Sequence, residues 1–404
     1  MGPLAGIRVL DLSRVLAGPW AGQCLADFGA EVIKIEKPGV GDETRTWGPP
    51  WLDLPEADTR QSAYFLSANR GKRAAAIDFT QAEGADLVRE LVKQSDVVLE
   101  NFKVSGLKKY GLDFDSLIAL KPSLVVCSIT GFGQTGPFAE QPGYDAMIQA
   151  QGGIMSLTGV PDGEPGAGPQ KVGVAVADLM TGMYAVSAVL AALIHARSTG
   201  IGQHIDLALL DTQVAWLANQ AMNYLVGGAV PQRLGTAHPN IVPYQSIATA
   251  DGFIMLAVGN DRQFASLCTA AGHSDIALDA RFQSNAARVA NRQVLMPMLE
   301  AWMLLQSTDS WLAALAAVNV PCGPINDLAR VFEHPQVKAR GLQIELPSHG
   351  VQVPQVANPV RFSKTPIEYR AAPPMLGQDT AAVLAEIGVS QQRFDALKLR
   401  RVVG

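Results

Sequence analysis

The sequence predicts an α/β protein, with a large domain on a Rossmann-like parallel sheet and a smaller α+β domain. Three observations lead to this prediction. Short apolar runs alternate with helical segments over the first third of the chain, and its 404 residues suffice for two or three domains. A stretch rich in Gly and Pro over residues 227–243 then interrupts the alternation. The composition, 48 % hydrophobic and 17 % charged, excludes a disordered chain, a coiled coil and a collagen-like fibre.

The elements of the large domain follow from the apolar pattern. Apolar runs predict strands over 7–11, 31–36, 75–78, 96–100, 124–129 and 203–206, and other segments predict helices over 21–28, 82–94, 115–120, 178–197 and 207–226. This spacing is typical of a parallel sheet covered on both faces. Residues 179–196 carry no formal charge and imitate a membrane span, but one short span is typical of a buried core helix, so we expect no membrane association.

The pattern changes after residue 226. Residues 244–258 predict a hairpin around Asp251-Gly252, and residues 261–271, 289–306 and 310–318 predict helices. The sequence predicts a strand and a loop over residues 351–362 and a helical tail over residues 376–399. We therefore expect residues 1–225 and 330–404 to form the large domain, and residues 226–329 to form the small domain with its linkers.

Charge and cysteine spacing exclude several classes of protein. The net charge of −5 provides no global basic field for a nucleic-acid backbone. The four cysteines lie more than fifty residues apart without metal-binding spacing, and the first residues do not resemble a secretory signal. We expect a cytoplasmic protein without a metal site.

The first strand–helix turn, residues 12–22, invites a dinucleotide-binding interpretation, because Glu36 ends the next strand. The G-x-G-x-x-G fingerprint is missing, and Pro19 stands where a flexible phosphate cradle would be. We therefore do not expect NAD binding.

Asp178 stands between two apolar segments. It is either a helix N-cap or a carboxylate nucleophile in surroundings of low dielectric constant. The histidines form no recognisable catalytic triad, and only His238 lies in the polar linker. The turn at Gly259 is either a mobile lid or a simple strand-to-helix turn.

Basic residues gather in the first 110 positions, at Lys34, Lys37, Arg45, Arg70, Lys72, Arg73, Lys103, Lys108 and Lys109. They are either solvated loop charges or a site for a ligand with several phosphates. Asn101 and Phe102 follow a strand and could offer an amide and a stacking ring to an adenine.

The chain resembles the class III CoA-transferases, the family of formyl-CoA transferase. The resemblance rests on DLSRVLAGP at 11–19, GAEVIKIE at 29–36, NRGKR at 69–73, ENF at 100–102, GFGQTGP at 131–137, GYD at 143–145, ADLMTG at 177–182 and VPCGP at 320–324. Within the family it is most similar to the succinyl-CoA:glutarate CoA-transferases, through GDETRTWGPP at 41–50, GTAH at 235–238, IVPYQ at 241–245 and NDRQF at 260–264.

The resemblance implies a site and a reaction. Asp178 would be the nucleophile that forms an aspartyl anhydride and an aspartyl-CoA thioester, with Tyr144 beside it. The CoA site would be lined by Val15, Ala17, Lys37, Lys72, Asn101, Phe102, Lys109 and Tyr110. Arg45, His238 and Gly259 are candidates for binding the acceptor acid. CoA esters would be substrates with no permanently bound cofactor, and the family's architecture is an interlocked homodimer.

Departures from the family pattern narrow the alternatives. Formyl-CoA transferase has a glutamine at the position of Leu16, and its glycine-rich lid is shortened here around Gly259, so formyl-CoA and oxalate are not expected substrates. The related α-methylacyl-CoA racemases have a histidine at the position of Tyr144, and a tyrosine is a poor second base. A racemase and a non-catalytic acyl-CoA-binding protein remain the alternatives.

Overall fold

The computed structural model describes residues 1–404, which form two compact units. The first comprises Met1–Met155, Lys171–Ala229 and Gln336–Gly404, and the second comprises Ser156–Gln170 and Val230–Pro335. The segment Ser156–Gln170, which the sequence placed in the large domain, thus belongs to the second unit. There Arg233 ties it down, donating to the Val160 carbonyl (3.2 Å) and pairing with Asp162.

A six-stranded parallel sheet forms the centre of the first unit, as the sequence predicts. Its strand order is β5-β2-β1-β6-β7-β8. In chain order the strands are β1 (Arg8–Asp11), β2 (Glu31–Glu36), β5 (Lys72–Ala76), β6 (Val97–Glu100), β7 (Val125–Thr130) and β8 (Gln203–Ala208). The remaining strands of this unit form two hairpins, β3 (Trp51–Leu54) with β4 (Thr59–Ser62), and β12 (Gln343–Ser348) with β13 (Val351–Val356).

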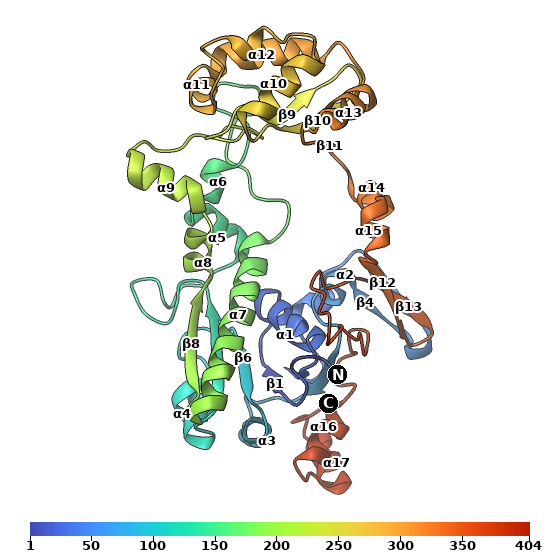
Figure 1. Cartoon of the computed structure of the whole chain (residues 1–404). Coiled ribbons are helices and arrows are strands. Elements are labelled where there is room, and N and C mark those ends of the chain that lie inside the picture. The colour runs from blue at the N-terminus through green and yellow to red at the C-terminus, as the bar shows by residue number, and fades with distance from the viewer. The chain divides into compact units, whose positions relative to one another are not determined.

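Helices cover both faces of the sheet (Figure 1). Successive strand residues point to opposite faces, so Val97 packs in one hydrophobic core and Val98 in the other. Against the Val97 face lie α1 (Ala17–Asp27), α5 (Asp145–Gln151), α7 (Val176–Thr199) and α8 (Leu209–Ala215); against the Val98 face lie α3 (Ala82–Lys93), α4 (Phe114–Leu120), α16 (Thr380–Glu386) and α17 (Gln391–Leu399). Two further helices, α2 (Ala63–Leu66) and α9 (Ala218–Gly227), belong to the same unit.

Helix α7 packs closely along α1. Ten of its 24 residues are buried, and a Cβ at Gly182 would lie 2.7 Å from the Ala17 carbonyl oxygen, so only glycine permits this approach. By length and composition alone α7, with a mean hydropathy of 1.7, could cross a membrane. Most of its buried residues instead join the core on the Val97 face, as the sequence predicts.

Two buried ion pairs hold the first strand–helix turn. The Lys34 ammonium lies 2.9 Å from Asp42, and the Lys72 ammonium lies 2.9 Å from Asp11, with all four side chains excluded from solvent. Lys34 also donates to the Ser13 carbonyl (2.8 Å). These contacts link the ends of β1, β2 and β5 and fix the loop that leads into α1.

The chain's last segment returns to the first unit. Arg70 and Asp27 form a buried ion pair (2.6 Å), and Asn358 donates to the same carboxylate (3.0 Å). On the surface, Arg8 and Arg73 both bind Glu386 of α16. The contacts of Asn358 and Glu386 join residues more than 300 positions apart in the sequence.

The second unit contains a three-stranded antiparallel sheet in the order β11-β10-β9. Its elements are β9 (Tyr244–Ala248), β10 (Phe253–Ala257), α10 (Asp261–Ala270), α11 (Asn285–Ala290), α12 (Arg292–Met303), α13 (Thr308–Ala317), β11 (Cys322–Pro324) and α14 (Leu328–Glu333), with α6 (Ile154–Leu157) and α15 (Pro335–Ala339) at the boundaries between the units. The helix expected over 289–306 is two helices that meet at Asn291, where Arg288 is buried and donates to the Val242 carbonyl (2.7 Å).

The buried pair predicts a large stability effect at Lys72. Lys72→Met leaves the Asp11 carboxylate buried without its partner, and we expect the free energy of unfolding to fall by about 3–5 kcal/mol. Chemical unfolding measures this change. The control Lys93→Met removes an exposed pair with Glu90 and should change stability by less than about 0.5 kcal/mol. Equal effects of the two substitutions would contradict the account.

Candidate active site

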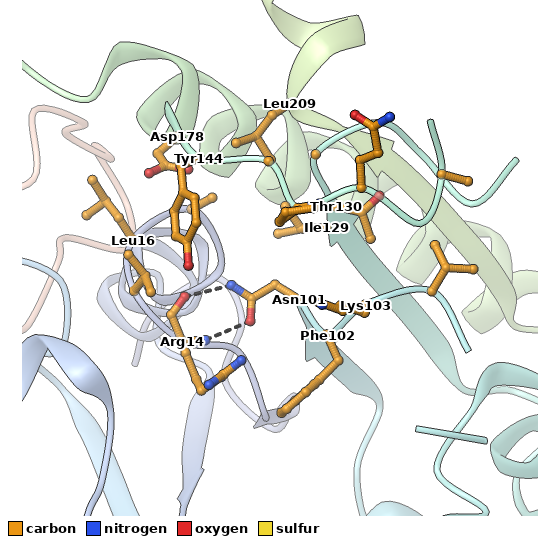
Figure 2. Close-up of a pocket in the computed structure, with 18 of the residues that line it drawn as sticks. Arg14, Leu16, Asn101, Phe102, Lys103, Ile129, Thr130, Tyr144, Asp178 and Leu209 are labelled. Carbon is orange, nitrogen blue, oxygen red and sulfur yellow. Dashed lines mark hydrogen bonds between the residues drawn. The ribbon is translucent and has the colours of Figure 1, made fainter. Parts of the chain in front are cut away.

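A cavity of about 190 Å³ opens at the carboxyl ends of β6 and β7. Figure 2 shows Asp178 and Tyr144 together on one side of it, and Arg14 with Asn101 and Phe102 on another. It is lined by Arg14, Val15, Leu16, Ala17, Glu43, Asn101, Phe102, Lys103, Val104, Ile129, Thr130, Gly131, Ala139, Gln141, Pro142, Gly143, Tyr144, Asp178 and Leu209. Ligands of open α/β sheets bind at this end of the strands.

Asp178 lies in the first turn of α7 but does not cap it. The N-cap position is Ala175, and the Asp145 Oδ1 atom accepts hydrogen bonds from the amides of Ala177 (2.8 Å) and Asp178 (3.3 Å). The N-cap interpretation of Asp178 is therefore wrong. Because Asp145 satisfies these amides, the Asp178 carboxyl is left to line the cavity.

Burial raises the pKa of the Asp178 carboxyl to about 7, and the negative charge of Asp145 adds to the shift. At this pKa the free carboxyl is protonated about half of the time near pH 7. A carboxylate with a raised pKa is also a stronger base, and its ionised form is a better nucleophile.

Two loops bring Tyr144 to the cavity. A Cβ at Gly131 would lie 2.5 Å from the Gly143 Cα atom, so the loop after β7 and the loop before α5 pack backbone against backbone. Tyr144 then precedes Asp145, the first residue of α5. Its side chain is 64 % exposed and lies beside Asp178 in Figure 2.

Asn101 and Arg14 form a reciprocal backbone clamp, drawn as dashed lines in Figure 2. The Asn101 side chain accepts from the Arg14 amide (2.9 Å) and donates to the Arg14 carbonyl (2.7 Å). Its amide is therefore occupied, which differs from the expected contact with an adenine. The Arg14 guanidinium lies 4.9 Å from the centre of the Phe102 ring and pairs with Glu43.

Val15 adopts a strained backbone conformation in the same loop. Its φ of +71° is costly for a β-branched residue. The Val15 amide points to the Asp42 carboxylate (3.2 and 3.3 Å), and the Lys34 ammonium helps to hold the pKa of Asp42 at about 2. The buried charge pair thus keeps this residue in a conformation that lines the cavity.

A second cavity of about 470 Å³ shares Arg14, Glu43, Phe102 and Lys103 with the first. The shared residues make the two cavities neighbours. The second cavity also contains Lys37, Lys109 and Tyr110, which the sequence assigned to the same ligand site as Asn101 and Phe102. Four cations line this cavity together with four carboxylates: Arg14, Lys37, Lys103 and Lys109, and Glu36, Asp42, Glu43 and Asp78. Glu36 and Asp42 are paired with Arg45 and Lys34, so the lysines at the cavity could still give a polyphosphate charge-assisted contacts.

Two predicted binding residues have other partners. Lys72 lines neither cavity, because its ammonium donates to Asp11, to the Pro19 carbonyl and to Asn69, each at 2.9 Å. All three of its N–H groups are used, so it supports the turn instead of offering charge to a ligand. The Arg45 guanidinium binds both oxygens of Glu36 (2.8 Å each) and lies outside the Asp178 cavity.

The last two predicted residues lie in the second unit. The His238 Nδ1 atom accepts the Asn240 amide (3.0 Å), and the ring packs against Tyr244. The Gly259 amide donates to the Gln263 side chain (2.8 Å), next to the N-terminus of α10. A role for either residue in acceptor binding stays a prediction.

Three residues near the site were not singled out by the sequence argument. Arg14 belongs to the conspicuous strand–helix turn, and its position could have indicated a ligand contact. Asp145 carries no such signal, because its partners lie on a distant helix. Burial and the charges of Asp178 and Asp145 raise the pKa of the Tyr64 hydroxyl to about 12, so this hydroxyl stays protonated at neutral pH and can donate a hydrogen bond.

Residues 4–380 match the family model described as CoA-transferase family III. The chain belongs to this family. As a CoA-transferase it is an enzyme whose substrates are CoA esters and carboxylic acids, and the two neighbouring cavities suit an acyl thioester and a phosphate-bearing nucleotide.

Curated relatives share the match over nearly the whole chain. A succinate–glutarate CoA-transferase of Agrobacterium fabrum is 53 % identical over 95 % of this chain and 96 % of the relative. The human succinyl-CoA:glutarate CoA-transferase is 42 % identical over 95 % of this chain and 86 % of the relative. An acetyl-CoA:oxalate CoA-transferase of Acetobacter aceti is 36 % identical, with 97 % of each chain covered.

Solved structures show the same fold. A CAIB/BAIF family protein from Brucella suis superimposes with a TM-score of 0.84 and 52 % identity, over 96 % of this chain and 99 % of that one. A Mycobacterium tuberculosis protein superimposes with a TM-score of 0.82 at 30 % identity, over 95 % of this chain and 99 % of that one.

The raised pKa of Asp178 predicts a stability change of defined sign. Its carboxyl binds a proton more tightly in the folded than in the unfolded chain, so ionisation lowers the free energy of unfolding as the pH rises from about 4 to about 7. Asp178→Asn removes this ionisation. We expect the variant of this CoA-transferase to be more stable by about 2–4 kcal/mol near pH 8, with a smaller gap near pH 5. Unfolding curves at both pH values measure the gap, and equal gaps would contradict the raised pKa.

The Arg14–Glu43 pair predicts opposite effects on CoA affinity. Arg14→Ala removes a cation between the two cavities and should weaken CoA binding about tenfold. Glu43→Gln frees Arg14 from its partner and should strengthen binding about twofold to threefold. Isothermal titration with free CoA measures both, with Arg393→Ala on α17 as an exposed control. Weaker binding in Glu43→Gln would contradict this assignment.

Proposed function

We propose that this enzyme moves CoA from succinyl-CoA, or a similar acyl donor, to a dicarboxylic acid such as glutarate. The observation that carries the proposal is the partly buried Asp178 carboxyl, which lines a cavity next to a second, lysine-bearing cavity. The named activities of the Agrobacterium and human relatives support succinyl-CoA and glutarate as the substrate pair.

In the first half-reaction the ionised Asp178 oxygen attacks the carbonyl carbon of the donor thioester. A C–O bond forms, the C–S bond breaks, and CoA leaves as a thiolate with the electron pair, so the product is an aspartyl–succinyl anhydride. The thiolate then attacks the Asp178 carbonyl carbon of this anhydride. Succinate leaves, and an aspartyl-CoA thioester remains.

The acceptor reverses these steps. Its carboxylate attacks the aspartyl-CoA carbonyl and expels the CoA thiolate, which then attacks the acceptor carbonyl of the new anhydride. The acyl-CoA product leaves, and the Asp178 carboxylate is restored. Once Asp178 is ionised, no step needs a proton transfer, and no histidine lines the Asp178 cavity.

The far carboxylate of a dicarboxylic acid needs a cation. Arg45, the sequence candidate, is neutralised by Glu36. Among the residues that line the Asp178 cavity, Arg14 and Lys103 carry positive charge. These two residues are the candidates for this contact in the first unit, and His238, in the second unit, stays a separate prediction from the sequence.

The racemase alternative has less support. Proton removal and return at opposite faces of a carbon need two basic groups. Tyr144 stands where a racemase would need its second base, and the curated relatives described above are all named transferases. A non-catalytic acyl-CoA-binding protein would have no use for the raised pKa of Asp178.

We propose that the enzyme is a homodimer, as the family resemblance implies. Helix α9 has no buried residue, and Met222, Tyr224, Leu225 and Val226 are all at least 49 % exposed. A ten-residue helix is marginal in water without packing, so a covering surface is needed. Sedimentation at several concentrations would measure the mass of the assembly.

Asp178→Asn tests the chemistry. We expect transfer from succinyl-CoA to fall by at least about 1,000-fold, because an amide oxygen cannot replace the nucleophile. Mass spectrometry of the wild type with succinyl-CoA alone should show a covalent adduct on the Asp178 peptide. The control Asp86→Asn makes the same change at an exposed position of α3 and should keep full activity. Undiminished transfer by Asp178→Asn would overturn the mechanism.

An acceptor panel tests the substrate. With succinyl-CoA as donor, we expect kcat/KM for glutarate to exceed that for butyrate by about 100-fold or more, since butyrate lacks the second carboxylate. Equal values for glutarate and butyrate would contradict a dicarboxylate site, while leaving the covalent mechanism intact.

A further inference from the structure

Three polar side chains meet on the sheet face opposite α7. Glu100 ends β6 and pairs in register with Ser128 of β7, and His204 of β8 pairs with Val126. Strand residues two apart share a face, so all three side chains lie on the face of Val98 and Val126, where α3 and α4 pack. The Asp178 reaction does not use them.

The three side chains form one buried polar cluster. Glu100, 8 % exposed, lies opposite Ser128 in the sheet, where the Ser128 hydroxyl acts on its carboxyl against the burial that raises its pKa, and the Ser128 Oγ and His204 Nε2 atoms lie 2.8 Å apart. The His204 ring stacks on Phe114 with centroids 4.9 Å apart and planes 12° from parallel. These residues line a cavity of about 220 Å³ to which Asp178 does not belong.

At one end of this cluster, Glu100 contacts a residue of the CoA site. The Glu100 Oε2 atom accepts the Phe102 amide at 2.8 Å. The Phe102 ring contacts the Arg14 guanidinium (4.9 Å) and the Phe79 ring (5.6 Å) and lines both CoA cavities. Residue 101, between Glu100 and Phe102, clamps the Arg14 backbone.

A buried carboxyl at the end of an apolar strand is costly unless its hydrogen bonds are satisfied. Glu100 meets this condition through Ser128 and the Phe102 amide. An apolar residue would suit the strand end better, but it could not hold that amide. The arrangement therefore has a geometric consequence, because it fixes the backbone direction where the chain leaves β6 and enters the CoA site.

We propose that Glu100, held by Ser128 and His204, is a positioning residue for CoA binding. It fixes Phe102 directly and Arg14 through Asn101, so the wall between the two cavities is formed before CoA arrives. The proposal rests on CoA binding in these cavities and does not depend on the acceptor acid. Loss of the Glu100 carboxyl should raise KM and Kd for the CoA ester. It should leave kcat nearly unchanged, because Asp178 belongs to α7, on the other face of the sheet.

The test compares variants of Glu100 in the full-length enzyme. Glu100→Leu cannot accept the Phe102 amide, and we expect Kd for free CoA and KM for succinyl-CoA to rise about tenfold, with kcat within about threefold. Glu100→Gln retains an acceptor for that amide and a donor for Ser128, so it should bind CoA within about twofold of the wild type. A Glu100→Leu enzyme with unchanged Kd would overturn the proposal, and so would Glu100→Gln binding as weakly as Glu100→Leu.

Further variants separate positioning from general destabilisation. Cys127→Ala removes a fully buried side chain from the opposite face of β7 and should lower the melting temperature without changing Kd. Ser128→Ala and His204→Phe change the cluster at residues that do not line the CoA cavities, and each should raise Kd for CoA about threefold. If Glu100→Leu does not fold, the Ser128 and His204 variants decide the test. Kd values within the error of the wild-type value would then overturn the proposal. Free-CoA binding is independent of the acceptor panel, so failure of one does not imply failure of the other.

Discussion

The hydrogen bonds from the first amides of α7 to Asp145 are the interaction on which the site depends. They satisfy the helix end without Asp178, whose carboxyl is left to line the cavity. They also place a second negative charge near Asp178, which raises its pKa together with burial. The Asp145 carboxylate thus binds the amides at the start of α7, and its charge makes the Asp178 carboxylate more reactive.

Several of the few charged residues of the chain are buried as ion pairs. The pairs Lys34–Asp42, Lys72–Asp11 and Arg70–Asp27 lie in the interior and link the sheet, α1 and the returning C-terminal segment. Such pairs add little net stability, but removing one partner is severe, so they act mainly by specifying geometry. The cations left to a ligand are those at the rim of the two cavities.

Much of the fold could be predicted from local patterns. Strand β2 occupies 31–36 as expected, and the apolar segment of α7 is a core helix. The single helix expected over 207–226 is two helices, α8 and α9. This division could not be predicted, because no local signal in the sequence marks the break near Trp216. The site was predicted less completely, since the partners of Lys72 and Arg45 become neighbours only after folding and occupy the charges assigned to a ligand.

Isotope transfer to Asp178 tests the central claim most directly. The enzyme would turn over succinyl-CoA with glutarate labelled with ¹⁸O in both carboxylates, and the Asp178 peptide would then be analysed by mass spectrometry. The anhydride mechanism predicts ¹⁸O in the Asp178 carboxylate, because the bridging oxygen of the second anhydride comes from the acceptor and stays with the aspartate. An unlabelled Asp178 peptide after many turnovers would contradict the account, because CoA would then have passed to glutarate without a bond to this residue.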